Sequence, residues 1–153
     1  MSRKITADEV ADYFIALAHQ RSASVNNLKL QKLLYYAQAW HLALYNRPLF
    51  PEKFQAWISG PVIPSVYWRF KEFGICDIPP SPAVPALPPD AAAFLNEVAG
   101  EYLLLDEWEL DGMTRRELPW LEARGGIDPA DPCSTELSEE DMRAYFRRLA
   151  DAA

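Results

Sequence analysis

Acidic side chains gather between positions 106 and 111, where they could act as a catalytic carboxylate group or as ligands of a cation: Asp106, Glu107, Glu109 and Asp111. Paired carboxylates serve general acid–base catalysis, and carboxylate oxygens bind hard cations. Negative charge in the first turn of a helix also complements the helix dipole. A solvated first turn is the simpler interpretation, so we predict no catalytic residue in this stretch.

The two histidines and two cysteines are the other candidates for chemistry: His19, His41, Cys76 and Cys133. Neither histidine has a carboxylate at metal-ligand spacing, and His41 falls on the core side of a predicted helix, where hydrogen-bonded structural histidines are common. Neither cysteine belongs to a C-x-x-C pair. We predict no metal site, no disulfide and no cofactor.

The motifs of common enzymes are also missing from the sequence. It contains no G-x-S-x-G, G-x-x-x-x-G-K or G-x-G-x-x-G, which build nucleophile elbows and phosphate-binding loops. The sequence therefore predicts a protein that is not an enzyme.

Composition predicts one soluble, cytoplasmic domain over residues 1–153. Half of the 153 residues are hydrophobic, enough to bury a sizeable core. No apolar run reaches the roughly 18 residues of a membrane span, and the start lacks the apolar core of a signal peptide. The net charge is −7 and the pI about 4.8, which repels phosphate backbones. We therefore expect neither a membrane nor a nucleic acid as partner.

Residues 26–45 predict the central helix around which the chain is organised. Seven residues share an arc of about 120° on a helical wheel, which is a core-facing stripe: Leu30, Leu33, Leu34, Ala37, Trp40, His41 and Leu44. A second apolar group, Leu28, Tyr35 and Leu42, lies on the far side among polar residues. A helix apolar on two sides is either buried between two layers or keeps one side for a partner.

The remaining pattern predicts a mainly α fold, a single compact domain of about six helices around the central helix. Thr6 with Glu9 has the spacing of a capping box for a helix over 7–21, and Ser138 has the spacing of a cap for the last helix. Alternation near residues 54–59 predicts a short strand or hairpin. Further helices are expected at about 64–73, 90–105, 107–116 and 119–124.

Residues 75–89 hold six of the thirteen prolines. Proline removes backbone donors and favours extended geometry, so this stretch is either a stiff loop across the domain surface or a ligand for an aromatic groove. The stiff loop is the simpler interpretation because proline-rich connectors are common.

Three stretches resemble the SocA-like antitoxin family, also called the Panacea domain: LKLQKLLYYAQAWHLAL, FQAWISGPVIPSVYWRFKEFG and LDGMTRRELPWLEAR. The resemblance runs over nearly the whole chain. It implies a mainly helical antitoxin that binds and neutralises a cognate protein toxin, with ClpX of the ClpXP protease as a further partner if the protein acts as a proteolytic adaptor. Family members often have histidine after the threonine of the third motif, whereas Thr114 here is followed by Arg115, so no role of that histidine carries over.

A small DNA-binding transcription regulator is the alternative function. Its recognition helix would need exposed basic residues, and the best candidates are Lys29 with Lys32, or Arg143 with Arg147 and Arg148. Loss of binding with rising salt would identify it, since phosphate contacts are salt-dependent.

The far side of the central helix, together with the turn that follows the predicted strand, is our predicted partner-binding surface. Aromatic groups among amides are typical of interfaces. The predicted residues are Gln31, Tyr35, Gln38, Leu42, Trp57, Gly60 and Pro61. In this hypothesis Tyr35 and Gln31 stay accessible; in the alternative, the last helices of the same domain cover them.

Overall fold

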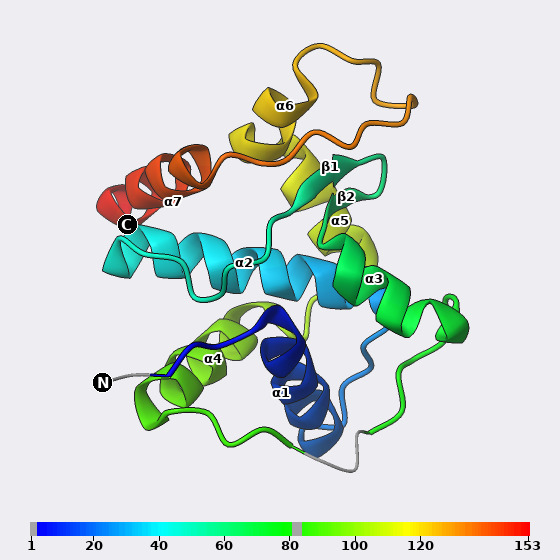
Figure 1. The fold of residues 1–153 in the computed structure, drawn as a ribbon, viewed down its shortest axis with the longest axis vertical. Coiled ribbons are helices and arrows are strands. Elements are labelled where there is room, and N and C mark those ends of the chain that lie inside the picture. The colour runs from blue at the N-terminus through cyan, green and yellow to red at the C-terminus, as the bar shows by residue number, and fades with distance from the viewer. Residues whose placement is uncertain (1–2, 81–83) are drawn as a thin grey trace.

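The computed structural model describes residues 3–80 and 84–153 and shows a mainly α fold, as predicted (Figure 1). Seven α-helices and one hairpin make up this part of the chain. Their bounds are α1 Ala7–Gln20, α2 Asn27–Tyr45, β1 Gln55–Trp57, β2 Gly60–Val62, α3 Pro64–Phe70 with a 3-10 turn Lys71–Phe73, α4 Pro89–Tyr102, α5 Glu107–Arg116, α6 Leu118–Arg124 and α7 Glu139–Ala152.

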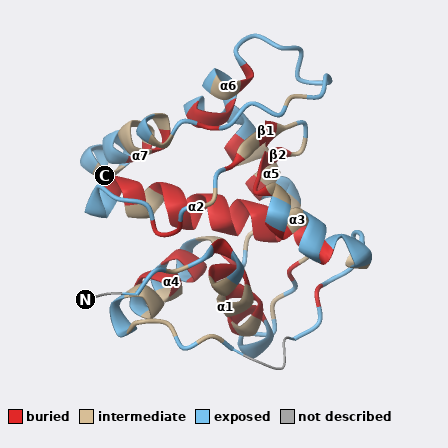
Figure 2. Cartoon of the chain, viewed as in Figure 1, coloured by how far each residue is buried: buried red, intermediate tan, exposed pale blue. Residues whose placement is uncertain are grey.

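Helix α2 is central, and it is buried between two layers. Helices α1 and α4 pack on one side of it, while α7, α5 and the hairpin pack on the other (Figure 1). Fourteen of its 19 residues are buried (Figure 2). The apolar residues on both sides of α2 therefore serve the core.

The predicted helix caps are confirmed. The Thr6 side chain accepts from the Glu9 backbone N–H, and the Glu9 carboxylate accepts from the Thr6 backbone in return. Asn26 caps α2 by accepting from the Lys29 backbone N–H at 2.9 Å. The αL residue that ends α2 is Asn46, with a φ of 58°.

One hydrophobic core joins residues from α1 to α7. Phe146 of α7 lies at its centre, with its ring centroid 5.8 Å from those of Tyr35 and Tyr36 and 5.1 Å from that of Trp40. The predicted core stripe of α2 is wrong at its end, because Leu44 is 47% exposed and His41 is half-buried. In the last turn of α2 the buried residues are Leu42 and Ala43 instead.

The hairpin β1–β2 is antiparallel, with Trp57 opposite Gly60. The segment before α7 lies along the outer edge of β1, since the Ala56 N–H donates to the Thr135 carbonyl and the Leu137 N–H donates to the Phe54 carbonyl. On the other side of this small sheet, β2 packs on α2 and α5. Both strands of the hairpin are therefore covered by other parts of the domain.

The proline-rich stretch connects the 3-10 turn to α4. Its Ile78 is buried and donates from its backbone N–H to the Val25 carbonyl at 2.9 Å. Residues 81–83 lie outside the described residues, so recognition of this stretch by an aromatic groove stays a prediction. Within the described ranges, no helix combines the length and apolarity needed to cross a bilayer.

Candidate partner-binding groove

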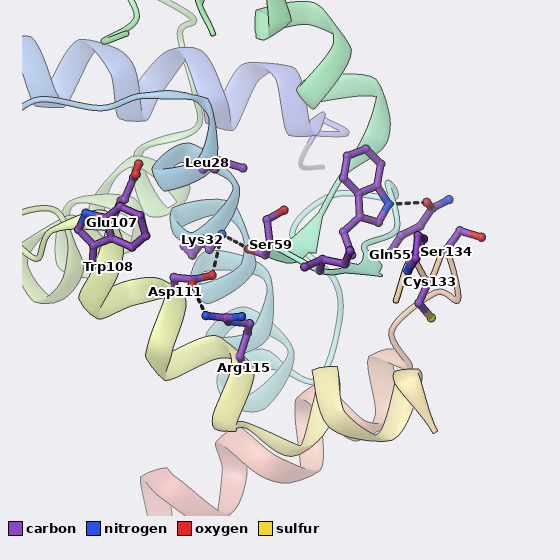
Figure 3. A pocket seen from close by; sticks show the side chains of 13 residues that line it. Leu28, Lys32, Gln55, Ser59, Glu107, Trp108, Asp111, Arg115, Cys133 and Ser134 are labelled. Atoms are coloured by element: carbon purple, nitrogen blue, oxygen red, sulfur yellow. Dashed lines mark hydrogen bonds and ion pairs between the residues drawn. The ribbon is translucent and has the colours of Figure 1, made fainter. Parts of the chain in front are cut away.

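A groove of about 670 Å³ opens where α2 begins, between the hairpin and α5 (Figure 3). Four segments far apart in sequence build it, and its lining residues are Leu28, Lys32, Gln55, Trp57, Ile58, Ser59, Glu107, Trp108, Asp111, Arg115, Pro132, Cys133 and Ser134. We call it the hairpin–α5 groove.

The two walls of the hairpin–α5 groove each carry a tryptophan. Trp57 comes from β1 and is half-buried; its indole N–H donates to Gln55 Oε1 at 2.8 Å. Trp108 comes from α5 and is 77% exposed, and Ile58 at the hairpin turn is 40% exposed. Exposed aromatic and aliphatic side chains in a concave site are typical of protein interfaces.

Lys32 forms the floor of the groove. Its ammonium donates to the Ser59 carbonyl and lies 3.6 Å from Asp111 Oδ1, while Asp111 Oδ2 lies 2.7 Å from Arg115 Nη2. Burial lowers the pKa of Lys32 to about 8, although the Asp111 carboxylate acts to raise it. The floor is therefore an ion-pair network that is fixed to the hairpin turn by the buried Lys32 and reaches solvent at the exposed Arg115.

Gly60 allows the hairpin to lie this close to the floor. Its φ is +102°, and a Cβ there would stand 3.1 Å from Thr114 Oγ1 and 3.3 Å from Lys32 Cε. The left-handed backbone and the tight approach both favour glycine.

The acidic cluster is the first turn of α5, as predicted. Asp106 caps the helix by accepting from the Glu109 backbone N–H at 2.8 Å, and Glu107 accepts from the Asn26 side-chain amide. Glu107 also lines the groove. Within the described ranges, no group of three or more His, Cys, Asp or Glu side chains could hold a metal ion.

The prediction that the far side of α2 stays accessible is wrong. Gln31, Tyr35, Gln38 and Leu42 are all less than 5% exposed. The amides bind backbone instead of solvent: Gln31 Oε1 accepts from the Ile63 N–H at 2.9 Å. Gln38 accepts from the Leu49 N–H and donates to the Phe50 carbonyl, both at 2.8 Å.

Helix α7 covers the far side of α2, as the alternative interpretation held. The Tyr35 ring makes edge contacts with the rings of Phe54 and Phe146, at 5.9 and 5.8 Å between centroids. Gly60 and Pro61 are also buried, because β2 packs against α2 and α5. Of the predicted surface, only Trp57 lines the groove.

Sequence reasoning missed Trp108, Ile58 and Arg115. One signal was available for Trp108. Residues two positions apart on a helix are separated by about 200° around its axis, so Trp108 must face away from the buried Leu110 on α5. Arg115, which follows the threonine of the third motif, lies on the groove and pairs with Asp111.

The other residues of the third motif are structural. Trp120 donates from its indole N–H to the Trp57 carbonyl at 2.8 Å, which ties α6 to the hairpin. Glu117 links α5 to α6 and is 8% exposed; its Oε2 accepts from the Tyr36 hydroxyl at 3.0 Å. Burial raises the pKa of Glu117 to about 7. The carboxylate Oε1 and the Tyr35 hydroxyl have no hydrogen-bond partner among the described residues.

The basic residues of α2 do not form a DNA-recognition surface in this structure. Lys29 and Lys32 are 8% and 1% exposed, and the Lys29 ammonium donates to the Leu103 carbonyl at 2.6 Å. On α7, Arg143 pairs with Glu140 and Arg147 with Asp151. Both lysines would have to leave the core to reach a phosphate.

The protein is a mainly helical domain built on a buried central helix, and a groove with tryptophans on its walls opens at one end of that helix. The family model described as "Antitoxin SocA-like, Panacea domain" matches residues 30–121, which is more than half of the chain. The protein therefore belongs to the SocA-like antitoxin (Panacea domain) family, as its motifs predicted.

A curated relative agrees with this assignment. The chain is 39% identical over 72 residues to "Antitoxin SocA" of Caulobacter vibrioides (strain NA1000 / CB15N). The match covers 47% of this chain and 38% of that relative, so the similarity spans well under half of the relative's length. No solved structure matches the chain.

Proposed function

We propose that this protein is the antitoxin of a bacterial toxin–antitoxin pair and that it neutralises its cognate protein toxin by binding it in the hairpin–α5 groove. The observation that carries the proposal is the groove itself, with two tryptophans on its walls and one of them 77% exposed. Nine of its thirteen lining residues fall within the segment matched to the antitoxin family.

Binding to a protein accounts for the groove better than catalysis or DNA recognition does. The antitoxin family is consistent with a regulatory role that is not enzymatic, without a cofactor. The net charge of −7 and the buried Lys29 and Lys32 disfavour a nucleic acid. We further propose that one antitoxin domain spans residues 1–153, because α1 and α7 lie outside the matched segment yet share the core with α2.

The predicted surface is revised accordingly. Trp57 remains a proposed contact with the toxin, joined by Ile58 and Trp108. The other predicted residues are proposed to support the groove from the core without contacting the toxin: Gln31, Tyr35, Gln38, Leu42, Gly60 and Pro61. Tyr35→Ala is therefore expected to destabilise the fold, so it is not a clean test of the surface.

The test is neutralisation in cells by variants at exposed tryptophans. The toxin is first identified as a protein that arrests bacterial growth when expressed alone and not when co-expressed with this chain. Trp108→Ala should then weaken toxin binding by more than about 1 kcal/mol and reduce protection. Trp68→Ala is the matched control, since Trp68 is 59% exposed and does not line the groove.

Melting temperatures should be unchanged in both variants, because neither side chain is buried. Full protection by Trp108→Ala, with normal affinity for the toxin, would place the toxin site elsewhere on the domain.

We also propose that the protein acts as an adaptor that hands the toxin to ClpXP. An adaptor needs a second surface that stays free when the first is occupied. A cavity of about 430 Å³ lies at the C-terminal end of α2, with Tyr45, Arg47 and Arg3 among its lining residues. On α2, Lys32 of the hairpin–α5 groove and Tyr45 of this cavity are 13 positions apart, which is roughly 20 Å along the helix at 1.5 Å per residue.

Purified ClpXP tests the adaptor proposal directly. The toxin should be degraded much faster when this protein is added, and the protein itself should survive. Arg47→Glu should abolish the acceleration without changing toxin affinity, whereas Trp108→Ala should reduce both the acceleration and the toxin affinity. Equal degradation with and without the protein would leave neutralisation by sequestration alone.

A further inference from the structure

We infer that the hairpin–α5 groove takes a segment of the toxin in which an arginine or lysine stands beside a bulky apolar side chain. This inference rests on the proposed function, which makes the groove the toxin site. It follows from which charges in the groove are already paired and from what the walls offer.

The unpaired charge around the groove is negative. Its two cations, Lys32 and Arg115, are both held by Asp111, at 3.6 and 2.7 Å. In contrast, no basic side chain of residues 3–80 or 84–153 forms an ion pair with Asp106, Glu107 or Glu109. Among residues 3–80 and 84–153, the Glu107 carboxylate accepts a side-chain hydrogen bond from a neutral amide, that of Asn26, and Glu107 lines the groove (Figure 3).

The walls add a second attraction for a cation. Trp57 lines the groove from β1 and Trp108 lines it from α5, where Glu107 lies beside Trp108 (Figure 3). The face of an indole ring attracts a guanidinium or ammonium group, and tryptophan does so best among the aromatic residues. Leu28, Ile58 and Pro132 supply the apolar lining that a neighbouring bulky side chain would cover.

An acidic segment fits the groove poorly. A carboxylate would meet Glu107 and could reach Arg115 only by displacing Asp111, which would leave the buried Lys32 without its counter-charge. The net charge of −7 also steers a basic partner toward the domain and repels an acidic one.

Three small probes that share one aromatic ring test the inference on the intact protein: phenethylguanidine, phenethyl alcohol and 3-phenylpropionate. Binding is followed by NMR on the indole N–H signals, of which the chain has five. The guanidinium should shift the signals of Trp57 and Trp108 and leave those of Trp40, Trp68 and Trp120 in place. It should bind at least about threefold more tightly than the alcohol, and the carboxylate should bind more weakly than the alcohol.

Two variants separate charge from shape. Glu107→Gln keeps an acceptor for Asn26 and removes the charge, so it should lower the preference for guanidinium over alcohol and leave only the part that the indole rings supply. Glu122→Gln, at an exposed position on α6 outside the groove, should leave the preference unchanged. Added salt should weaken guanidinium binding and leave alcohol binding unaffected.

A carboxylate that binds as tightly as the guanidinium, a preference that Glu107→Gln leaves unchanged, or no shift of Trp57 and Trp108 with any probe would each overturn the inference. The proposed function is decided separately, by whether Trp108→Ala loses protection against the toxin. Lost protection together with no guanidinium preference would keep the groove as the toxin site and reject a basic segment as its occupant.

Discussion

Replacing Glu117 by glutamine should remove a large pH dependence from the stability of this domain. Glu117 is 8% exposed, and burial raises the pKa of its carboxyl from an ordinary 4.5 to about 7, against the opposing hydrogen bond from Tyr36. Between pH 4.5 and about 7 the folded protein holds this proton while the unfolded chain releases it. The free energy of unfolding therefore falls as the pH rises through this window and levels off above it.

The size of the effect follows from the change in pKa. A difference of about 2.5 units at roughly 1.36 kcal/mol per unit gives about 3 kcal/mol, or roughly 6 to 12 °C in melting temperature for a domain of this size. Glutamine can still accept from the Tyr36 hydroxyl but carries no charge. Glu117→Gln should therefore be more stable than the parent by about 3 kcal/mol at pH 8.5 and close to it at pH 4.5.

Urea unfolding from pH 4.5 to 8.5 measures this difference. Subtracting the two curves removes the contribution of His41, whose pKa is lowered by burial and whose effect has the opposite sign. Glu122→Gln, which changes an exposed carboxylate, is the matched control and should follow the parent. Parallel curves for Glu117→Gln and the parent would refute the account of Glu117 as a buried carboxyl that the folded state keeps protonated.

The other predictions concern the core, the hairpin turn and the groove. Trp40→Ala should cost about 3 to 5 kcal/mol in urea unfolding, because Trp40 packs on Phe146 and donates to the Tyr102 hydroxyl at 2.8 Å. Gly60→Ala should lower the free energy of unfolding by about 1 to 3 kcal/mol. Gly100→Ala, on α4 with open space around it, is the control and should raise the free energy of unfolding by up to about 1 kcal/mol. Equal effects of the two substitutions in thermal melts would contradict the strain assigned to Gly60. A hydrogen bond with Thr135 lowers the pKa of the Cys133 thiol, which favours its reaction with iodoacetamide. Because Cys133 lines the groove, toxin binding should slow its alkylation and leave the exposed Cys76 unprotected, as peptide mass spectrometry would show.

Local signals were sufficient to predict the helices and their ends. The predicted caps, Thr6 with Glu9 and Ser138, both act as caps in the structure, because a cap is decided by residues three positions apart. The two apolar sides of α2 likewise indicated a helix placed between layers. What periodicity could not decide was whether the second layer belonged to this chain or to a partner.

The far side of α2 was wrongly predicted to be accessible because the amides of α2 have long-range roles. Gln31 binds the backbone of Ile63, 32 positions away, and Gln38 binds the backbone of Leu49 and Phe50. A glutamine that satisfies buried backbone groups cannot be distinguished, by sequence spacing alone, from one that faces solvent. The groove was missed for a related reason, since its walls come from Trp57, Trp108 and residues 132–134, which only the folded chain brings together.

The contrast between the floor and the walls of the groove bears on how binding specificity can evolve. Lys32 is tied to the hairpin and to α5 by buried contacts, so a change there would disturb the fold. Ile58, Trp108 and Arg115 are exposed, and their replacement costs little stability. Under the proposed function, homologues can therefore diverge at these three exposed positions to follow a changing toxin while they inherit the same scaffold, and a library randomised at the three positions would be a direct route to antitoxins of altered specificity.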